Sequence, residues 1–240
     1  DGYVTVTWMN GSTQIGETTD IMCGNTPSFT GTTPTKVTPQ YTYTSIGWAT
    51  TNNATTALAT LPAAGTSNLI FYAVYDETDS NENTTRTVNN YTVKWIVDGL
   101  ETETTYEYGA TPSYGTNPTK AEDATYTYEF SGWSPEIATV TGDATYTAQF
   151  TATAKTAIYT NMDAALEKAD AAIAAAGITD EVKTAIETAV ATAKQAAYNE
   201  DGEGNYTVQK TLDEENAQQK VDAAAAALMN TIQEYFDIDE

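Results

Sequence analysis

The sequence predicts a multidomain β plus α protein, in which two tandem, small, mostly β domains precede an antiparallel three-helix bundle. Three observations carry this prediction. One block of residues occurs twice, residues 1–153 alternate polar and apolar side chains as strands do, and alanine replaces threonine as the dominant residue after Thr153. With 240 residues the chain is long enough for two or three small domains.

The repetition is clearest in an aromatic decamer. The stretch ATYTYEFSGW, which ends at Trp133, nearly recurs as PQYTYTSIGW, which ends at Trp48. Further matches are Thr5–Trp8 with Thr92–Trp95, Gly24–Phe29 with Gly109–Tyr114, Pro34–Lys36 with Pro118–Lys120, and Phe71–Tyr75 with Tyr146–Phe150. We therefore expect β repeat 1 at 1–77 and β repeat 2 at 91–153. Repeat 1 carries extra residues, mostly between Ala49 and Asn68, which a surface loop would tolerate.

Each repeat is expected to form about four strands. Tyr91, Val93, Trp95 and Val97 occupy alternate positions, which is typical of a strand with one buried face. Val4, Val6 and Trp8 repeat the pattern, as do Tyr126–Phe130 and Tyr146–Phe150. Lys120–Ala124 could form one short helical turn. Residues 78–90 have almost no apolar side chain except Val88, so we expect a linker there.

The remaining residues, 157–237, predict three amphipathic helices. The expected apolar stripes are Met162, Leu166, Ala169, Ile173 and Ala176; then Val182, Ile186, Ala189 or Val190, and Ala193; then Val221, Ala225, Leu228, Ile232 and Tyr235. Gly177 ends the first helix, Thr179 caps the second, and Gly202 and Gly204 break the second. Asn216 with Gln219 resembles a capping box at the start of the third. Such stripes favour a small antiparallel bundle.

Charge and composition exclude several classes of function. Lys and Arg total 10 against 33 Asp and Glu, and the net charge of −23 repels nucleic acid and anionic membrane surfaces. No histidine is present, so a Ser-His-Asp or Cys-His arrangement is impossible. The single cysteine, Cys23, excludes an intrachain disulfide. No carboxylate pair stands out and no phosphate loop is present, so we expect no enzyme, no cofactor and no metal.

Aromatic side chains are the candidate contacts for a ligand, because exposed Trp and Tyr rings can stack on sugars. Trp8 and Trp95 fall on the same strand face as the valines, so we expect them in the cores. Trp48 and Trp133 follow a glycine at a strand end, and with Phe29 and Tyr114 they are the possible ligand contacts. Two acidic loops hint at calcium, Asp201–Asn205 and the set Asp79, Asn81 and Asn83. Counted from Asp201, the bidentate Glu of a calcium loop would fall at Leu212, so a solvated loop is the better interpretation.

The stretch YTVKW…YEYGATPSYGTNPTK…YTYEFSGWSPEIATVTGDATYTAQF, within residues 91–150, resembles the Listeria–Bacteroides type of repeat, related to internalin B-repeats. Residues 3–75 resemble it more loosely. The resemblance implies small β-grasp-like domains strung along secreted surface proteins of bacteria, chiefly Gram-positive ones. QQKVDAAAAALMNTI, residues 218–232, resembles the last helix of FIVAR-like three-helix modules, which also occur in bacterial surface proteins. Neither family supplies a catalytic motif.

Together these observations predict a non-catalytic segment of a bacterial cell-surface or secreted protein, acting as a spacer or an adhesion-associated repeat region. The alternative is a module that binds a glycan or a host protein through the exposed aromatics of the repeats. The chain begins inside a strand-like pattern, so we expect an extracellular fragment of a longer exported protein. We expect a monomer, with no nucleic acid partner and no membrane insertion in this segment.

Overall fold

A computed structural model describes residues 2–78 and 85–236. The described residues fall into two compact units. One contains the residues up to Thr116 together with Trp133–Thr147, and the other contains Asn117–Gly132 together with the residues from Ala148 on. The fold class is the predicted one, with tandem β domains followed by three helices.

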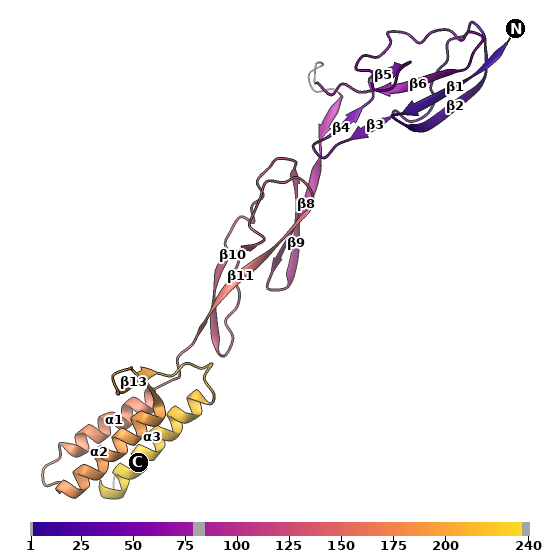
Figure 1. Cartoon of the computed structure of the whole chain (residues 1–240). Helices are drawn as coiled ribbons and strands as arrows, with labels where there is room; N and C mark the ends of the chain where they lie inside the picture. Colours follow the sequence, from indigo (N-terminus) through magenta and orange to yellow (C-terminus); the bar gives the residue numbers. More distant parts are fainter. Residues whose placement is uncertain (1, 79–84, 237–240) are drawn as a thin grey trace. The chain divides into compact units, whose positions relative to one another are not determined.

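Repeat 1 is built around a four-stranded mixed sheet in the order β2-β1-β6-β5. Figure 1 shows β1 between β2 and β6. A second, smaller sheet has the order β3-β4-β7. The strands are β1 (Tyr3–Asn10), β2 (Thr13–Met22), β3 (Thr35–Val37), β4 (Tyr41–Thr44), β5 (Gly47–Ala49), β6 (Leu69–Val74) and β7 (Arg86–Val88).

Repeat 2 has one four-stranded sheet in the order β10-β11-β8-β9. Its strands are β8 (Asn90–Val97), β9 (Leu100–Glu107), β10 (Tyr126–Ser134) and β11 (Ala144–Ala154). Lys120–Ala124 contains no helical turn, so that expectation is wrong. Asp123 explains the extended backbone, because its carboxylate accepts hydrogen bonds from the N–H groups of Thr125 and Tyr126 and ties the segment to the start of β10.

The two repeats share one topology. In each, the first strand pairs with its hairpin partner in antiparallel fashion and with the last strand of the sheet in parallel fashion. Trp8 lies opposite Phe71 across β1 and β6, and Trp95 lies opposite Tyr146 across β8 and β11. The strand pairing therefore places the matched rings of both repeats on equivalent strands.

The predicted linker at 78–90 is partly a strand, which corrects the expectation for its end. Arg86–Val88 form β7 and pair with β4, and the guanidinium of Arg86 lies 4.3 Å from the centre of the Tyr41 ring. The sequence pattern missed β7 because its strand adds backbone hydrogen bonds at a sheet edge and buries little apolar surface.

A comparison with repeat 2 explains β7. The N–H of Asn89 donates to the carbonyl of Gln40, as the N–H of Lys155 donates to the carbonyl of Thr125 at the matched position. β7 thus occupies the place beside β4 that the end of β11 occupies beside β10. The strand β6 ends at Val74, and pairing beside β4 resumes at Arg86 in β7.

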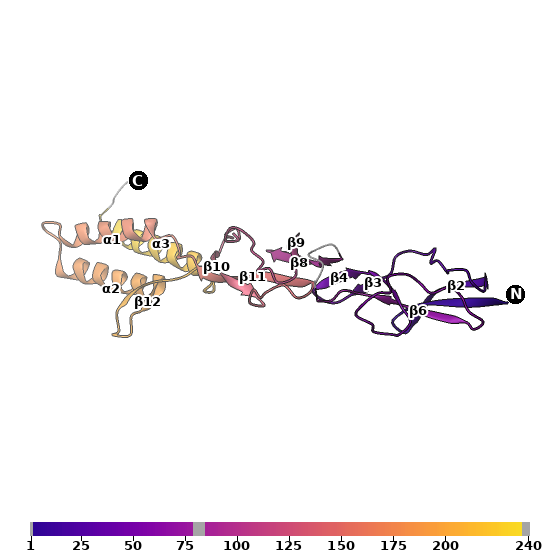
Figure 2. The same ribbon diagram turned by 90° about the horizontal axis from the view of Figure 1, so that it is seen from above.

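The helices agree with the sequence pattern. They are α1 (Thr160–Ile173), α2 (Asp180–Ala197) and α3 (Ala217–Phe236), and Figures 1 and 2 show them side by side. The hydroxyl of Thr179 accepts a hydrogen bond from the N–H of Val182, which confirms the predicted cap. Met162, Ile186, Val221, Leu228 and Ile232 are buried at their shared interface.

Four details of this module differ from expectation. A hairpin of β12 (Tyr198–Glu200) and β13 (Tyr206–Gln209) follows α2, where only a glycine-rich break was predicted. Asn216 precedes α3 as predicted, but its φ of 56° is left-handed, and no hydrogen bond of a capping box is formed. Tyr235, the last residue of the third stripe, is exposed rather than buried. Ala176, the last residue of the first stripe, is also exposed, because α1 ends at Ile173 and does not continue to Gly177.

Candidate functional site

Each repeat encloses a cluster of four aromatic rings. Aromatic cluster 1 contains Trp8, Phe29, Trp48 and Phe71, with ring centres 4.6–5.4 Å apart for the four pairs in contact. Aromatic cluster 2 contains the matched residues Trp95, Tyr114, Trp133 and Tyr146, at 4.8–5.5 Å. Edge-to-face and tilted contacts at these distances stabilise small cores beyond the area they bury.

Trp8 and Trp95 are 1% exposed, which confirms their predicted place in the cores. The four candidate contact residues, Phe29, Trp48, Tyr114 and Trp133, are half-buried and pack against those cores. Their rings contact one another and the buried rings of the clusters, so each is only partly accessible to a ligand. A role in binding for these four residues stays a prediction.

The two buried indoles differ in one hydrogen bond. The Nε1–H of Trp8 donates to the hydroxyl of Thr18 at 3.0 Å, whereas the buried Nε1–H of Trp95 has no hydrogen-bond partner. Thr104 lies opposite Val93 as Thr18 lies opposite Val6, but it forms no such bond. The register shifts between β1 and β2 have no counterpart between β8 and β9, and they change where the threonine hydroxyl lies.

This difference predicts unequal costs for two identical substitutions. Trp8→Phe breaks a hydrogen bond and leaves Thr18 unpaired, whereas Trp95→Phe removes a donor that is already unsatisfied. We expect Trp8→Phe to destabilise its repeat by about 1–3 kcal/mol more than Trp95→Phe destabilises its own. Urea unfolding followed at NMR resonances of each repeat measures both. Thr18→Val is the control, because it should abolish most of the gap; equal costs without that change would contradict the assignment.

The Asp201–Asn205 loop is the turn of the β12–β13 hairpin. The carboxylate of Asp201 accepts hydrogen bonds from the N–H groups of Glu203 and Asn205, from the Asn205 amide and from the Thr207 hydroxyl. These bonds, led by that from Glu203, lower the pKa of Asp201. Its oxygens are engaged within the turn, which agrees with the solvated-loop interpretation. Asp79, Asn81 and Asn83 lie outside the described residues.

A second carboxylate, Asp123, orders the end of repeat 2. The hydroxyl of Tyr128 donates to it at 2.6 Å, and with the N–H groups of Tyr126 and Thr125 it lowers the pKa of Asp123 from 3.8 to about 2. The ammonium of Lys155 donates to the Asp123 carbonyl at 2.7 Å. In repeat 1 the Thr38 hydroxyl takes the place of the carboxylate and bonds the N–H of Tyr41. The role of this position is to fix a turn.

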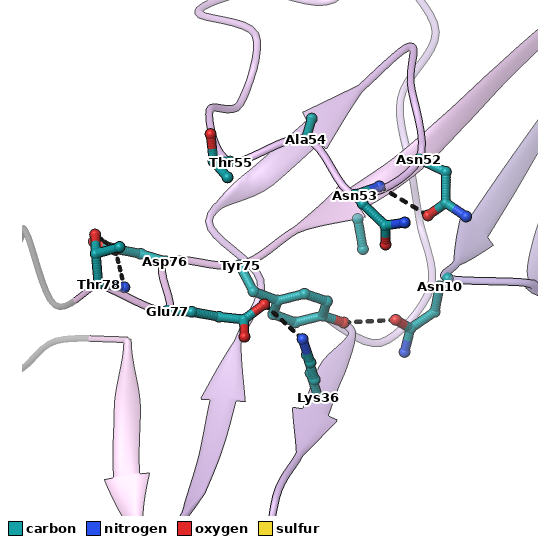
Figure 3. A pocket seen from close by; sticks show the side chains of 12 residues that line it. Asn10, Lys36, Asn52, Asn53, Ala54, Thr55, Tyr75, Asp76, Glu77 and Thr78 are labelled. Carbon is teal, nitrogen blue, oxygen red and sulfur yellow. Dashed lines mark hydrogen bonds and ion pairs between the residues drawn. The ribbon is translucent and has the colours of Figure 1, made fainter.

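A polar pocket of about 500 Å³ opens in repeat 1, and the sequence did not single it out. Figure 3 shows Asn52 and Asn53 from the loop after β5 on one side, and Tyr75 and Lys36 on the other. The Tyr75 hydroxyl donates to Oδ1 of Asn10 at 2.8 Å. These residues carry no periodic or spaced motif, so only their meeting in space reveals the pocket.

No group of three or more His, Cys, Asp or Glu side chains in residues 2–78 and 85–236 is placed to hold a metal ion. Within the same ranges, each helix is too short or too polar to cross a bilayer.

No family model matches this chain, and no curated protein matches it either. The resemblances to internalin-type repeats and to FIVAR-like modules therefore stay predictions. Among solved structures, the chain is similar to domains 3–4 of the Streptococcal High Identity Repeats in Tandem (SHIRT) from a cell surface protein. The match has 14% identity and a TM-score of 0.25, and it covers 64% of this chain and 99% of the other. A likeness of this size carries no argument about fold or function.

Proposed function

We propose that this chain is a non-catalytic segment of a bacterial cell-surface or secreted protein, in which the two β repeats act as spacers. The observation that supports the proposal most is the strand order. In each repeat, the first and last strands of the main sheet are neighbours and run parallel. We further propose three domains, formed by residues 1–77 together with β7, by residues 91–153 and by residues 157–237.

Parallel terminal strands suit a domain that transmits tension. When two neighbouring strands are parallel, the start of one and the end of the other lie at opposite ends of the pair. Tension applied there acts along the strands, so the hydrogen bonds between β1 and β6 are strained together in shear. Between antiparallel strands pulled at their open end, the bonds would break one after another. A spacer in a surface protein benefits from the first arrangement.

The junctions between domains are also hydrogen-bonded. Asn89 donates from Nδ2 to the carbonyls of Thr38 and Pro39, and its Oδ1 accepts from the Thr42 hydroxyl at 2.7 Å. The Tyr91 hydroxyl donates to the Pro39 carbonyl. At the other junction, the N–H of Leu212 donates to the Lys155 carbonyl at 2.7 Å, and Thr156 bridges to Thr211. Spacer domains joined in this way keep a more constant separation than domains joined by an unstructured linker.

Asn89→Ala tests whether the junction is ordered by this side chain. The substitution removes three side-chain hydrogen bonds, so we expect β7 to open more often and the amides of Thr87 and Asn89, which face β4, to exchange about tenfold faster or more. Asn90→Ala is the matched control, because Asn90 is exposed and its side chain forms no hydrogen bond to another described residue. Equal exchange in the two variants would argue against an ordered junction and against this form of the spacer proposal.

The alternative is a module that binds a glycan or a host protein through Phe29, Trp48, Tyr114 and Trp133. The equivalence of aromatic clusters 1 and 2 gives this alternative a specific signature, because a ligand of one cluster would have a matched site in the other. Titrations that perturb Trp48 and Trp133 in parallel would favour it. A ligand that perturbs neither ring would not.

A further inference from the structure

The geometry points to a binding site for a neutral sugar unit in the polar pocket of repeat 1. The site goes beyond the spacer role and does not depend on it. It also differs from the aromatic clusters, because none of their rings lines the pocket.

The pocket forms where the two segments that distinguish repeat 1 from repeat 2 meet. Residues 50–68 connect β5 to β6 and contribute Asn52 and Asn53, while the insertion that follows Tyr75 contributes Asp76 and Glu77. Repeat 2 has neither insertion at the matched places. Loops added to a repeated scaffold are where a binding function is commonly placed.

Two substitutions within matched strands also make this region polar in repeat 1 alone. Asn10 stands where repeat 2 has Val97, and Tyr75 stands where repeat 2 has Phe150. Asn10 and Tyr75 are hydrogen-bonded to each other, and Asn10 also donates to the Thr35 carbonyl at 3.0 Å. This hydrogen bond holds two lining side chains of the pocket in place. In repeat 2 the matched Phe150 packs against Phe130 instead.

The side chains around the opening offer donors and acceptors that other described residues do not occupy. Oδ1 of Asn52 accepts from the N–H of Asn53, which leaves the Asn52 NH₂ group unbonded. The side-chain amide of Asn53 forms no hydrogen bond to a described residue, and Figure 3 shows it on the side of its loop that faces Tyr75. Amides that can donate and accept at once match the paired donor and acceptor character of sugar hydroxyls.

The Tyr75 ring and the charged side chains of the pocket restrict the class of ligand further. The Tyr75 ring is half-buried and lies between Asn53 and Lys36, so one of its faces can pack against the C–H face of a pyranose (Figure 3). Lys36 pairs with Glu77 at 2.5 Å. Asp76 is 5% exposed as a residue, and its carboxylate accepts hydrogen bonds from the N–H and the hydroxyl of Thr78. The charged side chains of the pocket therefore sum to −1, which disfavours acidic sugars and phosphates. A volume of about 500 Å³ suits a ligand of one or two sugar units.

Saturation-transfer NMR on the full chain tests this assignment. The probes are glucose, galactose, mannose, fucose, N-acetylglucosamine and N-acetylgalactosamine, with glucuronic acid as the acidic probe and triglycine as a neutral peptide. We expect saturation of at least one neutral sugar, none of glucuronic acid, and shifts of the Asn52 and Asn53 side-chain amides. Asn53→Gly, which keeps the φ of 61° accessible, should weaken binding about fivefold or more. Asn117→Gly, at an exposed asparagine outside the pocket, should leave binding unchanged.

Three results would overturn the assignment. They are the absence of saturation of every neutral sugar, binding that is unchanged in Asn53→Gly, and binding of triglycine in place of sugars. Parallel shifts of Trp48 and Trp133 would also overturn it in favour of the aromatic clusters. None of these results bears on the strand order from which the spacer role is argued, so the two proposals can fail separately.

Discussion

Replacing Trp95 with alanine is expected to unfold repeat 2 while repeat 1 stays folded. The indole is 1% exposed and contacts Tyr114, Trp133 and Tyr146. Truncating a buried Trp costs about 3–5 kcal/mol. A domain of this size has a total stability of about 3–10 kcal/mol, so the loss removes much or all of it.

The control for this substitution is Leu100→Ala in the same repeat. Leu100 is 75% exposed on β9, so its truncation should change the free energy of unfolding by about 0.5 kcal/mol or less. Urea titrations followed by NMR resonances of each repeat separate the outcomes. If Trp95→Ala left the resonances of repeat 2 folded and dispersed, the ring cluster could not be the core that holds the repeat together.

Pulling repeat 1 in two directions is expected to give very different unfolding forces. With handles at the start of β1 and the end of β6, tension acts along two parallel strands and strains their hydrogen bonds together. With handles at the start of β1 and the end of β2, where Tyr3 pairs with Met22, tension separates an antiparallel hairpin one bond at a time. The first geometry should need the higher force at the same pulling speed.

The comparison uses one domain with the same core and the same stability, so only the direction of force differs. Engineered cysteines carry the handles, and Cys23→Ser in both variants leaves no other thiol. Force-induced unfolding reports the unfolding barrier, which is the quantity that matters for a spacer under tension. Equal forces in both directions would remove the mechanical argument for the spacer role.

The sequence predicted the helices and the central strands well, and the reason is periodicity. Val221, Leu228 and Ile232 recur at the helical spacing and are buried, and Val6 and Trp8 alternate and are buried. In these elements one face is apolar and the other polar, so the pattern in the sequence records which face is buried. Thr179 was recognisable as a cap because capping requires only its own hydroxyl and a backbone N–H group of the first helical turn, here that of Val182.

Elements that depend on distant backbone were missed. β7 is ordered by pairing with β4, more than forty positions earlier, and its exposed side chains carry no apolar pattern. The β12–β13 hairpin is local, but its short and mostly exposed strands carry no apolar pattern either, so this segment was read as a glycine-rich break. Short exposed strands owe their order to a partner's hydrogen bonds, which a local pattern does not record.

The candidate site was also predicted only in part from the sequence. Repetition correctly indicated that Trp48 and Trp133 are equivalent, and the structure places them in equivalent clusters. The polar pocket escaped notice because it is made of what the repeats do not share, two insertions and the exchange of Val97 and Phe150 for Asn10 and Tyr75. Matching copies draws attention to the common scaffold, whereas a function specific to one copy lies in the differences.

The most direct test of the account is amide hydrogen exchange of the intact chain carrying Trp95→Ala. The central claim is that each repeat is stabilised by its own ring cluster. It predicts that the amides of β8–β11 lose their protection, while those of β1, β2 and β6 exchange as slowly as in the unaltered chain. Loss of protection in both repeats together would show one shared cooperative unit, and would contradict the claim that this chain is built from two separate β domains.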